Sequence, residues 1–114
     1  MKYTDILEPV IQILKEANGA FQTPYQICFR LQERDPALWA RLADEYQSAE
    51  EDISMGAGTG TNYSPASFVS HTLEYHSREN PRIQRADFAC AGVTFRDVKP
   101  ADTDTVVSIW SIRN

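Results

Sequence analysis

Hydrophobic residues recur every three or four positions over most of the first 78 residues, and this spacing predicts four amphipathic helices. The expected helices cover residues 4–18, 24–34, 36–48 and 64–78. Pro9 falls inside the first of them, where it removes a backbone hydrogen bond, so the regular part of this helix is expected to begin only near Glu8. Each helix carries its apolar residues on one side, which indicates packing around a shared core.

Three of the helix starts carry the same local signal, a residue that can cap a helix followed directly by proline. These pairs begin at Thr23, Asp35 and Ser64. After Thr23, a glutamine at the third helical position, Gln26, completes the pattern of a capping box. Gly19 stands where the first helix should end. The sequence therefore marks its helix boundaries clearly.

The last third of the chain changes to β-branched and aromatic residues, which predicts two strands, near residues 86–96 and 105–113. The polar stretch between them is too long for a two-residue turn. At 114 residues and 42 % hydrophobic content, the chain fits one domain over residues 1–114. The expected fold class is α+β, with four helices followed by a C-terminal two-stranded antiparallel hairpin.

This order of elements, with a short extended link around residues 20–22 and the helix starts TPYQICFRL and SPASFVSHTL, resembles a winged-helix domain. The resemblance implies that helix 64–78 is the recognition helix, which in this family usually enters the major groove of DNA. It also implies that residues 97–104 form the wing, which touches the DNA backbone or the minor groove.

Net charge narrows the choice of partner. The chain carries a formal charge of −5, which argues against a protein that coats DNA without specificity. Residues 1–57 hold five basic and ten acidic side chains, whereas residues 58–114 hold six of each. The excess acid is therefore confined to the first half, and both DNA and a protein remain open as the partner.

The fourth helix carries polar residues at steps of three or four, which would form one stripe along its surface. The candidate partner-binding residues are those of the stripe, its cap and the arginines that follow: Ser64, Ser67, His71, Arg78, Arg82 and Arg85. Glu74 belongs to the same stripe. We expect a non-enzymatic binding module that contacts its partner through helix 64–78. The plainer alternative is an ordinary solvated face.

An alternative site lies just before this helix, in a glycine-rich segment that would supply backbone N–H groups to an anion at a helix start. Its candidate residues are Gly56, Gly58, Gly60, Thr61 and Ser64. In this reading the protein binds a small molecule or anion, with a pocket beside Trp39 or Trp110. The plainer interpretation is that residues 47–62 are a mobile connection and that both tryptophans pack in the core.

No residue pattern indicates a cofactor, a metal or a catalytic group. His71 and His76 are five residues apart, which places them on different sides of a helix. Cys28 and Cys90 form no CxxC pair and are interpreted as reduced core thiols. The acidic stretch over residues 44–52 lacks the ligand spacing of an EF-hand.

Location and assembly follow from the same features. The sequence has no apolar run long enough to cross a membrane and no secretory leader, so the protein is expected to be cytoplasmic, without a membrane partner. If the apolar strand 106–112 lies at a sheet edge, it would pair with a second copy and form a homodimer.

Overall fold

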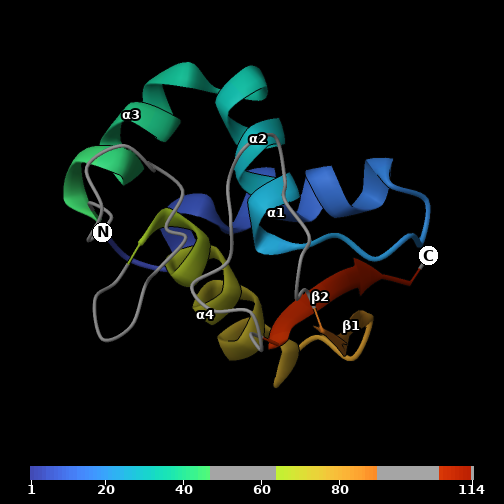
Figure 1. The fold of residues 1–114 in the computed structure, drawn as a ribbon. Coiled ribbons are helices and arrows are strands. Elements are labelled where there is room, and N and C mark those ends of the chain that lie inside the picture. Colours follow the sequence, from blue (N-terminus) through green and yellow to red (C-terminus); the bar gives the residue numbers. More distant parts are fainter. Residues whose placement is uncertain (47–63, 90–105, 114) are drawn as a thin grey trace.

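A computed structural model describes residues 1–46, 64–89 and 106–113 of the chain. In order, its elements are α1 (Thr4–Glu16), α2 (Pro24–Arg34), α3 (Pro36–Glu45), α4 (Pro65–Ser77), β1 (Ile83–Ala89) and β2 (Val106–Ile112) (Figure 1). Four helices followed by a C-terminal two-stranded antiparallel sheet confirm the predicted α+β class. The predicted connection at residues 47–62 and the predicted wing at residues 97–104 lie outside the described residues.

The predicted caps all form. The hydroxyl of Thr23 accepts the backbone N–H of Gln26 at 3.1 Å, and the side-chain oxygen of Gln26 accepts the N–H of Thr23 at 2.8 Å. Asp35 accepts the N–H of Leu38 at 3.1 Å and so caps α3. Ser64 caps α4 through a hydrogen bond from a backbone N–H. These caps satisfy donors that the first turn of each helix leaves free, so the sequence fixes where α2, α3 and α4 begin.

The start of α1 differs from the prediction. The helix is regular from Thr4 and runs through Pro9, rather than beginning near Glu8. The early turn is held by the Asp5 carboxylate, which accepts the N–H of Lys2 at 2.8 Å, and by complete burial of Ile6. Burial of an isoleucine contributes about 1.5–3 kcal/mol, which offsets much of the cost of the proline.

α1 ends just before Gly19, the residue that the sequence marks as its stop, but two residues earlier than the predicted range. The predicted helix extended to residue 18, but the structure ends it at Glu16. Asn18 and Gly19 both adopt positive φ angles, 53° and 85°. Only glycine takes such angles without a steric penalty, and asparagine takes them more readily than most residues. Together the two residues turn the chain toward the link that precedes α2.

The two strands pair antiparallel, from Ile83 opposite Ile112 to Ala89 opposite Val106. β1 begins three residues before the expected start at residue 86, because its first residues pair with the end of β2 although only Ile83 among them is a strong strand former. Pairing with β2 therefore extends β1 over three residues whose own strand propensity does not predict a strand.

The extended link before α2 joins this sheet. The N–H of Gln22 donates to the carbonyl of Trp110 at 2.7 Å, and the N–H of Trp110 donates to the carbonyl of Gln22 at 2.9 Å. Both backbone hydrogen bonds of Trp110 therefore go to Gln22, while β1 lies on the other side of β2, with Arg85 opposite Trp110. The expected homodimer through strand 106–112 assumed an open edge, and at this position the edge is already occupied.

The core gathers residues from all four helices and both strands into one cluster. Its completely buried members include Val10 of α1, Leu31 of α2, Leu42 of α3 and Leu73 of α4. Trp39 and Trp110 are 8 % and 1 % exposed, which confirms that both tryptophans pack in the core. In Figure 1, α4 crosses below α2, and the strands lie beside the C-terminal end of α4. Within the described ranges, no helix combines the length and the apolar character needed to cross a membrane.

Candidate functional site

The polar stripe of α4 borders the surface but is not uniformly exposed. Arg78, the C-cap residue of the helix, is exposed, whereas Ser67, His71 and Glu74 are half-buried. The buried side of α4 carries Phe68, Val69, Thr72 and Leu73, as the apolar spacing predicted. The helix therefore presents a partly covered polar face that becomes open toward its C-terminal end.

Ser64 has a different role from the one expected for a contact residue. It is only 1 % exposed, and its hydroxyl accepts the N–H of Ser67 at 3.1 Å. The capping bond occupies the hydroxyl, and burial removes it from the surface. Because the same group cannot also face a partner, Ser64 belongs to the frame that holds α4 in place.

The three candidate arginines separate into two groups. Arg78 and Arg82 are exposed and form no ion pair with any residue that the structure describes. Arg85 lies 3.8 Å from a carboxylate oxygen of Glu74 and 3.9 Å from one of Asp87, and its guanidinium lies 5.7 Å from the centre of the Trp110 ring. Arg85 thus covers the core tryptophan, and neighbouring acids offset its charge. Of the three candidate arginines, Arg78 and Arg82 are therefore the two available to a partner.

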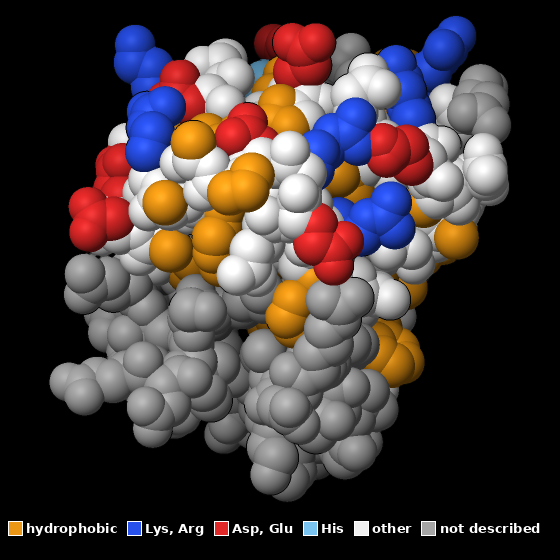
Figure 2. Space-filling model, turned by 90° about the horizontal axis from the view of Figure 1, so that it is seen from above, with side chains coloured by type: hydrophobic (Ala, Val, Ile, Leu, Met, Phe, Trp, Pro, Cys, Tyr) orange, Lys and Arg blue, Asp and Glu red, His pale blue; other side chains and the backbone are white. Residues whose placement is uncertain are grey.

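Among the described residues, the excess of acidic side chains lies in residues 1–46. Residues 1–46 carry five basic and seven acidic side chains, while residues 64–89 and 106–113 together carry four basic and three acidic ones. Figure 2 looks onto the molecule from the side of α2 and α3, where acidic and basic side chains are interspersed with small hydrophobic areas. On the described part of that face, neither sign of charge forms a continuous patch.

A small polar hollow of about 160 Å³ lies where the first turns of α2 and α4 approach β2. Its lining consists of Pro24, Tyr25, Ala66, Ser67, Ser70, Val107 and Ser108. Ser70 connects α4 to the sheet, since its hydroxyl accepts the indole N–H of Trp110 at 3.3 Å. This bond fixes the start of α4 against β2 and therefore sets the orientation of the polar stripe.

A second hollow, of about 440 Å³, is lined mainly by aromatic rings, and we call it the aromatic hollow. Its lining residues are Met1, Lys2, Tyr3, Tyr46, Phe68 and Tyr75. The rings of Tyr46 and Phe68 stack with centres 4.5 Å apart, while Tyr3 lies tilted between Phe68 at 5.3 Å and Tyr75 at 5.4 Å. Tyr75 is 49 % exposed and forms the outer side of the hollow.

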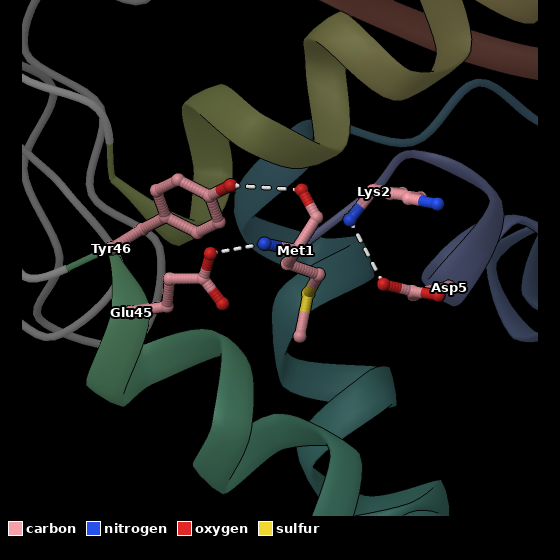
Figure 3. A network of polar contacts seen from close by, with 5 residues as sticks. All are labelled: Met1, Lys2, Asp5, Glu45 and Tyr46. Carbon is pink, nitrogen blue, oxygen red and sulfur yellow. Dashed lines mark hydrogen bonds and ion pairs between the residues drawn. The ribbon is translucent and has the colours of Figure 1, made fainter.

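Polar contacts fix one rim of the aromatic hollow, as Figure 3 shows. The Tyr46 hydroxyl, at the end of α3, donates to the carbonyl of Met1 at 3.2 Å. The Met1 amine forms an ion pair with Glu45, so the start of the chain lies beside the end of α3 (Figure 1). Segments 45 residues apart in sequence thus meet at this rim.

Trp39 and Trp110, beside which the sequence predicted an aromatic pocket, are buried in the core, because their large apolar surfaces are best buried there. The two hollows described above are lined by other residues. The seven-residue spacing of Phe68 and Tyr75 on one helix face was the available sequence signal. Tyr3 and Tyr46 join them only through tertiary folding. The glycines of the alternative anion site, together with Thr61, lie outside the described residues.

Other reactive groups give no site. Cys28 is completely buried as a free thiol, and burial raises the pKa of this thiol strongly, so it is a core residue as predicted. Cys90 lies outside the described residues. Among residues 1–46, 64–89 and 106–113, no group of three or more His, Cys, Asp and Glu side chains is arranged to hold a metal ion.

Comparison of the chain with protein-family models, with curated proteins and with solved structures gives no match. The arrangement of four helices and an antiparallel strand pair is compatible with the order of a winged-helix domain.

Proposed function

We propose that this protein is a small winged-helix-like binding module that docks the outer side of α4 against duplex DNA. The observation that carries the proposal is the position of two exposed arginines, Arg78 and Arg82, where the polar stripe of α4 leads into β1. Guanidinium groups next to a polar helix face suit contact with phosphates beside a groove.

The contacts of the sheet hold α4 in a fixed position, which supports its role as a contact surface. Since Gln22 pairs with Trp110, the link before α2 is fixed to β2, and Ser70 fixes α4 to the same tryptophan. α4 is therefore held rigidly against the strands. A rigid frame reduces the entropy lost on binding, which favours a helix that acts as a contact surface.

The expected affinity is modest. Two free arginines would neutralise about two phosphates, while Glu74 and the net charge of −5 oppose the approach of DNA. Binding should therefore be strongest at low salt. The proposal assigns to Ser67 and His71, both half-buried on the stripe, contacts with base edges or the sugar-phosphate backbone.

Salt-titrated fluorescence anisotropy with a labelled duplex tests the proposal. Replacing both Arg78 and Arg82 with alanine should weaken binding and reduce the slope of log K against log salt by about 1.8, because each lost phosphate contact reduces it by about 0.9. The matched control replaces Lys15 and Arg41, two exposed cations of α1 and α3, and should leave the slope unchanged.

Circular dichroism confirms that each variant is folded before its affinity is compared. Absence of wild-type binding to any duplex at low salt would overturn the DNA proposal and leave a protein as the partner of α4. If the control pair reduced the slope as much as the α4 pair, the contact would not be localised on α4.

A further inference from the structure

We infer that the aromatic hollow is a binding site for a small, uncharged, planar aromatic ligand. This inference is independent of the proposed contact between α4 and DNA. The volume of about 440 Å³ lies within the range of small-molecule sites, which is roughly 300–1,000 Å³. A ring system of one or two fused rings is the size of ligand that such a volume accommodates.

The geometry of the rings favours a planar aromatic occupant. Phe68 is 2 % exposed and forms the floor, with Tyr46 stacked on it at an interplanar angle of 18°. Tyr3 is tilted by 42° to both Phe68 and Tyr75, so the rings are splayed rather than layered. Tyr75 leaves 49 % of its surface to solvent, more than the other three rings of the hollow, since Phe68 is buried and Tyr3 and Tyr46 are half-buried. A flat ligand beside Tyr75 would recover aromatic contact at that surface.

The charges at the rim are balanced, which favours an uncharged ligand. Glu45 is engaged by the Met1 amine, and the Asp5 carboxylate accepts the backbone N–H of Lys2. Two cationic groups, the Met1 amine and the Lys2 ammonium, therefore stand near two carboxylates and offset each other. The rim offers no unbalanced charge to attract an anion or a cation.

Indole is the probe, and the measurement is an amide chemical-shift titration of the full chain. Saturable shifts are expected at residues 1–3, 46 and 68–75, with nuclear Overhauser contacts from indole to the rings of Tyr3 and Tyr75. Tyr75→Ala should weaken binding roughly fivefold or more, the effect of one stacked ring. Tyr75→Phe keeps the ring and should bind indole within about twofold of the wild type. Phe21→Ala, which removes another ring that is 40 % exposed, is the matched control and should change nothing.

Two probes of different chemistry define the ligand class. Benzyltrimethylammonium has a similar ring and a positive charge, and cyclohexanol is neutral but not aromatic; both should bind more weakly than indole. Tighter binding of the cation would overturn the inferred class. Absence of saturable shifts or of contacts to Tyr75 in the wild-type protein would overturn the site itself, and this result needs no variant.

Discussion

Replacing Ser64 with alanine should destabilise the protein without changing its contact surface. Ser64 stands at the start of α4, is 1 % exposed and receives the N–H of Ser67 at 3.1 Å. The alanine variant removes the acceptor and leaves that N–H without its cap. Because water has little access to a buried cap, the donor is not easily satisfied again.

The magnitude follows from this burial. Loss of a serine cap lowers the free energy of unfolding by about 0.5–2 kcal/mol. Because Ser64 is almost fully buried, we expect a value in the upper half of this range, about 1–2 kcal/mol. At about 2.1 cal/mol/K per residue, unfolding of 114 residues carries an entropy of about 240 cal/mol/K. The melting temperature should therefore fall by about 4–8 °C.

Thermal unfolding followed by circular dichroism measures the change. Ser64→Thr keeps the hydroxyl, and the extended backbone of this residue, φ −130° and ψ 167°, suits a β-branched side chain, so most of the stability should return. Ser67→Ala is the matched control: it should alter the melting temperature by less than about 2 °C, because its side chain is not the cap. A melting temperature unchanged in Ser64→Ala would refute the reasoning.

Three further outcomes follow from the structure. A hydrogen bond from Arg34 of α2 lowers the pKa of Glu16 in the folded protein, so wild type should have a larger free energy of unfolding than Glu16→Gln. This difference should be complete above about pH 4.3, the pKa in the unfolded chain, and should vanish as the pH falls through the lower folded pKa. Chemical unfolding at several pH values measures it, and a difference that persists at pH ~2 contradicts the expectation. In a Cys90→Ala background, iodoacetamide should label the buried Cys28 only after unfolding, and rapid labelling of the folded protein would be inconsistent with the burial. Glu74→Gln should tighten DNA binding by roughly two- to fivefold at low salt, because it removes an acid beside Arg85 on the α4 face, and an unchanged dissociation constant would count against that contact surface.

Most of the fold was predictable because its signals are local. The caps at Thr23, Asp35 and Ser64 depend on residues within one turn, and the apolar spacing identifies the buried side of each helix. The predictions that were wrong concern helix and strand starts that depend on contacts with segments distant in sequence. β1 begins at Ile83 because it pairs with β2, and α1 is regular before Pro9 because Ile6 is buried by other elements. Neither partner is visible in a short stretch of sequence.

The candidate site was predictable only in part. The spacing of polar residues located the stripe of α4, and Arg78 is exposed as expected. The sequence could not show that Arg85 lies over Trp110 beside Glu74, since these residues belong to β1, β2 and α4 respectively. The aromatic hollow was missed for the same reason. Its rings come from α4, the beginning of α1 and the end of α3, and only the fold brings them together.

An amide chemical-shift titration with a short duplex at low salt tests most directly whether α4 is the contact surface. We expect shifts along residues 67–78 and at Arg82, with α2 and α3 unaffected. Shifts confined to α2 and α3, or none at all, would contradict the assignment of α4 as the contact surface.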